Sequence, residues 1–240
     1  GAARLTLATR LNRMNERYAT TVPPRHGSTS RHLEHVEHGF GPVWDASSRV
    51  LVLGSMPSPK SRAMRFYYGH PRNRFWPVMA EIFKDESCMP AGPNDIDGTG
   101  DSRNKGILSG MDSAERRTAA LVERRRRFAL RHHIALWDVI ASCDIVGASD
   151  ASIRNAKPND IASIIARSRI THVFATGAKA SQLYRRLCQP HLETLGYGPE
   201  ELPMTQLPST SPANARTGLP QLVDAYRSIK TTIEHSGKEE

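Results

Sequence analysis

Short apolar runs that alternate with helical patterns constrain the fold of this chain more than any other feature of its sequence. The first run, residues 49–54, reads Arg-Val-Leu-Val-Leu-Gly and is typical of a strand that is buried on both faces. Similar runs occur at residues 134–139, 170–175 and 204–207. Helical patterns occur at residues 75–83, 114–132, 158–168, 178–188 and 220–234. This alternation predicts an α/β fold in which helices cover both faces of a parallel sheet.

The loops that follow these strands are the predicted location of a binding site. In open parallel sheets, ligands bind beyond the carboxyl ends of the strands. The corresponding segments are 54–58, 138–143, 176–177 and 208–216. A phosphate-binding loop of the Walker type is disfavoured in the first segment, because Pro59 precedes Lys60 where that motif requires Gly.

Composition divides the chain into three parts. Residues 1–38 are rich in Arg, Thr, Ser and His and contain few apolar residues, so we expect a flexible basic N-terminal arm. Residues 39–235 are expected to form a single domain, because the length favours one core and the sequence has no internal repeat. Within it, residues 85–113 are rich in Gly, Asp, Asn, Ser and Pro, which predicts a surface insertion.

Charge and residue usage disfavour several classes of protein. The 33 Lys and Arg residues exceed the 24 Asp and Glu residues by nine, which suits a polyanionic partner such as nucleic acid. No stretch approaches the roughly 18 apolar residues of a membrane span, so we expect a soluble, cytoplasmic monomer. The absence of a Cys-x-x-Cys pair disfavours a zinc or iron–sulfur site. Three histidines in segment 32–38 lack Cys or carboxylate partners and favour a solvated arm over a metal site.

Three motifs occur in an order that matches a known enzyme family. They are Gly54-Ser55-Met56-Pro57-Ser58, Tyr67-Tyr68-Gly69-His70-Pro71-Arg72-Asn73-Arg74-Phe75-Trp76 and Leu207-Pro208-Ser209-Thr210-Ser211-Pro212-Ala213-Asn214. In this order they resemble the uracil-DNA glycosylase superfamily, and within it the hypoxanthine-DNA glycosylases of family 6. The resemblance extends over residues 39–230 and includes segments 135–139 and 158–160.

The resemblance implies a three-layer α/β/α sandwich around a four-stranded parallel sheet, which agrees with the four predicted strands. It also implies a monofunctional DNA glycosylase that needs no metal or cofactor. Such an enzyme flips a deaminated base out of DNA and hydrolyses its N-glycosidic bond in base-excision repair. Hypoxanthine (deoxyinosine) is the expected base. The alternatives are a uracil-DNA glycosylase of the G:U mismatch type, a DNA-binding protein of this fold with little catalysis, and an unrelated basic RNA-binding module.

Asn73 is the residue that the resemblance implies to be catalytic. Met56 stands where mismatch-specific uracil enzymes carry an Asn that holds the attacking water, and Leu207 stands where many members carry His or Asn. Neither apolar side chain can orient water, whereas the Asn73 amide can position water and hydrogen-bond a base without a shifted pKa. The alternative for Asn73 is a helix N-cap, because a helical pattern follows it.

The remaining site residues are assigned by residue type and motif position. Contacts to the flipped base are expected from Tyr68, by stacking, and from Gly54, Ser55, Met56 and Thr176. Contacts to DNA are expected from Ser58, Ser209, Thr210, Ser211, Asn214 and Arg216. Asp138 is interpreted as a structural carboxylate that holds a loop. The arginines of segment 116–131 leave two interpretations open, a solvated helix face and DNA contact.

Overall fold

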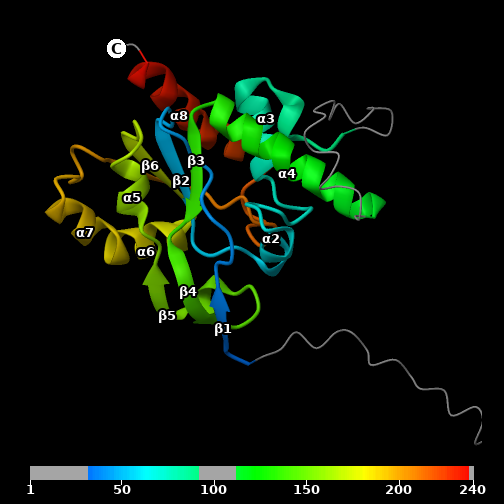
Figure 1. Cartoon of the computed structure of the whole chain (residues 1–240), viewed down its shortest axis with the longest axis horizontal. Helices are drawn as coiled ribbons and strands as arrows, with labels where there is room; N and C mark the ends of the chain where they lie inside the picture. Colours follow the sequence, from blue (N-terminus) through cyan, green and yellow to red (C-terminus); the bar gives the residue numbers. More distant parts are fainter. Residues whose placement is uncertain (1–31, 92–111, 238–240) are drawn as a thin grey trace, which may run out of the picture. The chain divides into compact units, whose positions relative to one another are not determined.

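The computed structural model describes residues 32–91 and 112–237, and its centre is a four-stranded sheet (Figure 1). The strands are β2 (Val50–Gly54), β3 (Ile134–Asp138), β6 (His172–Thr176) and β7 (Met204–Leu207). Their order is β3-β2-β6-β7, and every neighbouring pair is parallel. All four coincide with the predicted apolar runs. β2 and β3 are buried along their whole length, as expected for strands covered on both faces.

Two layers of helices cover the sheet, so the predicted three-layer α/β/α sandwich is confirmed. One layer holds α3 (Phe75–Phe83), α4 (Ser113–Arg131) and α8 (Leu219–Ser236), and the other holds α5 (Ile161–Ile165), α6 (Ala178–Leu187) and α7 (Gln189–Thr194) (Figure 1). α4 begins with a capping box between Asp112 and Glu115. The short helix α2 (Pro59–Met64), which the sequence patterns do not indicate, follows β2 closely.

The register of the sheet brings the strand ends to one edge. Gly54 lies opposite Asp138, and Thr176 lies opposite Leu207. Position 54 excludes a side chain, because a Cβ there would stand 2.1 Å from Oδ1 of Asp138. Gly177 follows β6 with a φ of +99°, a conformation that side chains rarely adopt. Glycine at these two positions therefore permits the close packing at the edge where a site is expected.

A second, three-stranded antiparallel sheet is not indicated by the sequence patterns. It has the order β1-β4-β5 and consists of β1 (Glu34–Glu37), β4 (Ile140–Ile145) and β5 (Arg154–Pro158). The prediction of a helix over 158–168 is therefore wrong at its start, because α5 begins only at Ile161, behind an Asp160 cap. β1 and β5 are largely exposed and polar, so they lack the apolar run that marks a buried strand.

The two segments expected outside the core are partly folded into it. β1 lies inside the expected arm 1–38, and His38 just after it is only 4% exposed, so the last residues of that segment belong to the domain. In the expected insertion 85–113, η1 (Glu86–Cys88) packs against α4. Residues 1–31 and 92–111 of these segments lie outside the described residues. Among the helices of the described residues, none has the length and apolar character needed to cross a membrane.

The core holds three cysteines as free thiols. Cys88, Cys143 and Cys188 are all buried. Burial raises the pKa of Cys88 to about 11 and the pKa of Cys188 to about 12. The two thiols therefore stay protonated at neutral pH and pack as small apolar groups.

Candidate active site

A pocket of about 490 Å³ opens at the edge where the strand ends meet. The predicted site residues that line it are Gly54, Ser55, Met56, Ser58, Tyr68, Asn73, Thr176, Ser209, Thr210, Ser211 and Asn214. Arg216 is exposed and does not line the pocket. The sequence also gives no indication that residues between Ile145 and Asp150, which follow β4, form part of the wall.

One part of the lining, which we call the aromatic–amide wall, consists of Tyr68 and Asn73 with Phe75 behind them. The rings of Tyr68 and Phe75 are stacked, with centroids 3.8 Å apart and 13° between their planes. The Tyr68 hydroxyl lies 3.3 Å from Oγ1 of Thr176. Burial raises the pKa of Tyr68 well above its usual value, so its ring is neutral. Because Phe75 covers one face, the Tyr68 ring is a rigid surface on which a base can stack.

Asn73 lies just before α3 and lines the pocket. Its Oδ1 accepts a hydrogen bond from the backbone N–H of Phe75 at 2.9 Å, at the start of α3. Because that N–H is a donor, the oxygen of the amide must face it, and this fixes the orientation of the side chain. The Nδ2 group makes no hydrogen bond with the described residues, and Asn73 lines the pocket. The N-cap position itself is Arg74, so Asn73 lies one residue before the cap, satisfies the first backbone N–H of α3 and also offers two N–H donors.

Arg74 organises the loop after β7, a role that the sequence does not indicate. Its guanidinium donates to the carbonyl oxygens of four loop residues, Thr210, Ser211, Asn214 and Thr217. The backbone N–H of Arg74 also donates to Thr210, at 3.1 Å. This set of bonds ties the last motif to the residue beside Asn73, so the two motifs are held as one unit.

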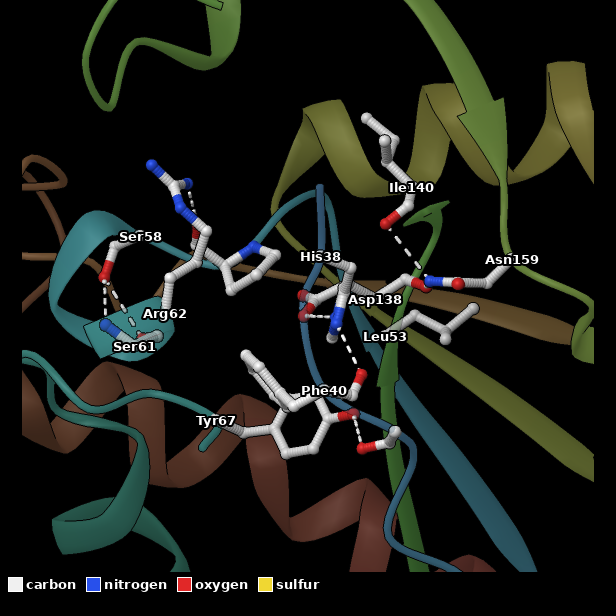
Figure 2. Close-up of polar contacts among 12 residues, drawn as sticks. His38, Phe40, Leu53, Ser58, Ser61, Arg62, Tyr67, Asp138, Ile140 and Asn159 are labelled. Atoms are coloured by element: carbon white, nitrogen blue, oxygen red, sulfur yellow. Dashed lines mark hydrogen bonds and ion pairs between the residues drawn. The ribbon is translucent and has the colours of Figure 1, made fainter. Parts of the chain in front are cut away.

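A second part of the lining, the carboxylate wall, consists of Asp138 and Asp150. Oδ2 of Asp138 lies 2.9 Å from Nε2 of His38, whose Nδ1 lies 2.8 Å from the carbonyl oxygen of Phe40 (Figure 2). Asp150 accepts a hydrogen bond from the Ser55 hydroxyl at 2.8 Å. Burial raises the pKa of Asp150, and the charge of Asp138 acts in the same direction. Both carboxyl groups are therefore held by specific partners.

The loop after β3 is also fixed, which supports the structural interpretation of Asp138. Nδ2 of Asn159 donates to the carbonyl oxygens of Asp138, at 2.9 Å, and of Ile140, at 3.1 Å (Figure 2). The side chain of Asp138 meanwhile binds His38, which lies just after β1. Asp138 therefore joins the central sheet to the segment that follows β1.

Comparisons with known proteins identify the family of this chain. A family model described as the uracil DNA glycosylase superfamily matches residues 41–230. The chain belongs to this superfamily. It is therefore a DNA glycosylase by family, a class of hydrolase that acts on DNA, and the alternative of an unrelated RNA-binding module is wrong.

Relatives of this superfamily member include two proteins named hypoxanthine DNA glycosylase. The protein from Methanosarcina acetivorans is 25% identical over 184 residues, which cover 75% of this chain and 90% of that protein. The protein from Methanosarcina barkeri is 25% identical over 161 residues, covering 67% and 80% respectively. A solution NMR structure from M. acetivorans, provisionally named uracil DNA glycosylase, shares the fold with a TM-score of 0.57. That structure is 24% identical and covers 84% of this chain and 100% of its own.

Two positions at which this superfamily member departs from the uracil enzymes are apolar in the structure as well. Met56 is 9% exposed and lines the pocket, whereas Leu207 is 3% exposed and is not part of its lining. Neither side chain offers a hydrogen bond to water or base. Among the motif residues that line the pocket, Asn73 carries an amide N–H group that makes no hydrogen bond with the described residues, whereas Nδ2 of Asn214 is used within its own loop.

The residues expected to contact DNA fall into two groups. Ser58 accepts from the backbone N–H of Ser61 and caps α2, while Nδ2 of Asn214 donates to the carbonyl oxygen of Ser209 at 2.8 Å. Thr210 is only 1% exposed. These three side chains serve the local structure. The hydroxyl oxygens of Ser209 and Ser211 also accept hydrogen bonds within the loop, from the backbone N–H groups of Ser211 at 3.2 Å and of Ala213 at 3.3 Å. Their O–H groups have no acceptor among the described residues and both residues line the pocket, so they stay the predicted phosphate contacts of the last motif.

The arginines of α4 are used mainly within the protein. Arg125 lies over the ring of Trp76 at 5.0 Å, and Arg126 lies over the ring of Phe66 at 5.8 Å. Arg124 donates a hydrogen bond to the carbonyl oxygen of Ser87. Arg127 forms an ion pair with Glu123, and Arg131 forms one with Asp85. Packing and ion pairing thus account for most of this run, and the structure favours the helix-face interpretation over DNA contact.

Proposed function

We propose that this DNA glycosylase removes hypoxanthine from DNA. The observation that carries the proposal is the meeting of Tyr68 and Asn73 in one pocket, with apolar Met56 in place of a water-holding Asn. The names of the two Methanosarcina relatives support hypoxanthine as the base. Coverage of most of their length supports transfer of the activity as a whole.

The proposed chemistry needs stabilisation of a departing base. As the bond between the sugar C1′ and the base breaks, positive charge develops on the sugar and negative charge on the base. The Tyr68 ring holds the flipped base in place by stacking, while Nδ2 of Asn73 donates to an acceptor atom of the base. Because Oδ1 of Asn73 is held by Phe75, the donor group is oriented before the substrate binds. Water then adds to C1′, and the free base and an abasic sugar result.

Two duplexes that differ only in the damaged base test the proposal. One carries a single deoxyinosine and the other a single deoxyuridine, and strand cleavage is followed after alkali treatment of the abasic product. We expect cleavage of the deoxyinosine strand at a rate well above that of the deoxyuridine strand. An intact deoxyinosine strand beside a cleaved deoxyuridine strand would show that the uracil alternative is correct.

A second candidate is a DNA-binding protein of this fold with little catalysis. The observation that favours it is the apolar character of both Met56 and Leu207, which removes two polar groups from the machinery. This candidate predicts tight binding to the deoxyinosine duplex without formation of an abasic site. An electrophoretic mobility assay on the same duplexes, run beside the cleavage assay, separates the two candidates.

A further inference from the structure

A second hollow of about 740 Å³ lies beside the base pocket and takes no part in the proposed chemistry. We call it the α6 groove. It is lined by α6, by Gln206 of β7 and by Asp150 and Ala151 of η3 (Asp150–Ser152). Asp150 lines both hollows, so the α6 groove begins where the carboxylate wall of the base pocket ends.

Three cations of α6 line this groove. Lys179, Arg185 and Arg186 make no hydrogen bond or ion pair with any residue in the described ranges 32–91 and 112–237. The two arginines are exposed, and Lys179 is half-buried. α6 contains no acidic residue to neutralise them. Asp150 lines the same groove and interacts electrostatically with Lys179. In contrast to the arginines of α4, Arg185 and Arg186 are therefore the charges most available to an external anion.

The spacing of the cations suits a chain of phosphates. Lys179, Gln182 and Arg186 lie three and four residues apart and so share one face of the helix. Seven residues of helix extend over about 10 Å, which is the rise of about three nucleotides of a DNA strand. Lys179, near the start of α6, is the cation nearer the edge of the sheet that holds the base pocket.

We propose that the α6 groove binds the backbone phosphates of the damaged strand on one side of the flipped nucleotide. The proposal rests on the superfamily's action on DNA. The strand would leave the base pocket past Asp150 and continue along the cations of α6. The side chains of Gln182 and Gln206 add uncharged donors along the same path.

Salt dependence of DNA binding tests the groove without any need for cleavage. The probe is a short duplex with a tetrahydrofuran abasic analogue, and its dissociation constant is measured by fluorescence anisotropy between about 50 and 200 mM salt. The logarithm of the dissociation constant rises with the logarithm of the salt concentration, and each lost phosphate contact reduces this slope by ~0.9. We therefore expect Lys179→Gln/Arg185→Gln/Arg186→Gln to lower the slope by about two to three and to weaken binding at least tenfold.

A matched variant separates a local contact from a general loss of charge. Arg116→Gln/Arg117→Gln/Arg127→Gln removes three charges from exposed positions of α4 that line neither the base pocket nor the α6 groove. We expect its slope to fall by less than half a unit and its cleavage rate to stay at the wild-type value. Equal slopes for the two triple variants would overturn the proposal.

Trimming the duplex locates the contact. We expect the wild-type protein to lose affinity when the damaged strand is shortened on one side of the lesion and to lose much less when it is shortened on the other. The α6 triple variant should be insensitive to the first trimming. Equal sensitivity to both sides, or a variant as sensitive as wild type, would also overturn the proposal.

Two further controls separate a failure of the groove from a failure of folding. The double variant Arg185→Gln/Arg186→Gln removes the two exposed charges and leaves Lys179 in place beside Asp150. Unchanged near-ultraviolet circular dichroism shows that the groove variants are folded. A changed slope with no cleavage of deoxyinosine or deoxyuridine would refute the proposed function and leave the groove standing. Normal cleavage of deoxyinosine with unchanged slopes would refute only the groove.

Discussion

The two walls of the base pocket are built from opposite chemistry. The aromatic–amide wall carries groups that stay neutral at physiological pH, and its orientation is fixed by Phe75 and by the Arg74 bonds to the neighbouring loop. The carboxylate wall carries Asp138 and Asp150, whose side chains are held by His38 and Ser55. On this division we assign the proposed base binding and bond cleavage to the neutral wall and expect a pH dependence of stability from Asp150 on the acidic one.

The largest expected effect falls on the neutral wall, at Asn73. Loss of one oriented donor to a developing anion lowers kcat by about 10² to 10³-fold. We expect this loss in both Asn73→Ala and Asn73→Ser, measured by single-turnover cleavage of a deoxyinosine duplex. The serine hydroxyl can still accept from the backbone N–H of Phe75, so only Asn73→Ala should also lose about 1 kcal/mol of unfolding free energy. A fully active Asn73→Ser would mean that the residue supports the start of α3 and nothing more.

The next effect concerns the support of that wall. Arg74→Lys keeps the charge but cannot reach four carbonyl oxygens, so we expect the free energy of unfolding to fall by about 2 kcal/mol. The Michaelis constant should rise as the loop after β7 loosens. Arg72→Lys, two residues away and exposed, is the control and should change stability by less than about 0.5 kcal/mol. Similar denaturation midpoints for the two variants would contradict the role assigned to Arg74.

A smaller effect is expected from the stacking ring. Tyr68→Leu removes an aromatic contact worth about 1–3 kcal/mol, so the Michaelis constant should rise about 10-fold or more. Tyr68→Phe keeps the ring and loses only the 3.3 Å contact of the hydroxyl with Thr176, so its kinetics should stay close to wild type. Steady-state kinetics on the deoxyinosine duplex measures both. The assignment fails if the phenylalanine variant is as impaired as the leucine variant.

The smallest effect lies on the carboxylate wall and appears in stability. Burial raises the pKa of Asp150 above its ordinary value of 3.8, so the folded state binds the proton more tightly than the unfolded state. The free energy of unfolding therefore falls as pH rises from the unfolded pKa through the raised folded pKa. Asp150→Asn removes this loss, so at neutral pH it should be slightly more stable than wild type. Below the ordinary pKa the difference should vanish.

Asp144 provides a comparison of opposite sign for the same measurement. Its pKa is lowered, chiefly by the hydrogen bond from Asn155 and then by the bond to His35. Its contribution to stability is therefore present above the unfolded pKa and is lost as pH falls through the folded pKa. Urea denaturation of Asp144→Asn across the same pH range should show a loss at neutral pH. A loss in both variants would contradict the difference between the two sites.

The central sheet could be predicted because burial on both faces leaves continuous apolar runs. β2 and β3 bury every residue, so their sequences carry a strong signal. The small sheet could not, because β1 reads Glu-His-Val-Glu and is largely exposed, so it lacks the apolar run that marks a buried strand. The end of the expected arm is likewise not predicted to be folded, because the composition of β1 resembles that of a solvated segment.

The site shows the same division between side-chain and backbone information. Tyr68 and Asn73 lie in a motif with a recognisable order, and the structure places both at the predicted edge. Arg74 lies in the same motif, but its partners are backbone carbonyl oxygens. Because every residue carries such an oxygen, the sequence does not indicate which of them Arg74 binds. Asp150 follows an antiparallel strand, so the rule that selects the ends of parallel strands does not reach it.

The buried thiols of the core make this protein suitable for labelling with a single probe. Since Cys88, Cys143 and Cys188 are all buried and burial raises the pKa of each, maleimide reagents that need an accessible thiolate will leave them unmodified in the folded protein. Ala213 is exposed on the loop that Arg74 holds, so Ala213→Cys supplies one reactive position at the mouth of the pocket. A fluorophore there would follow the entry of a flipped nucleotide in real time.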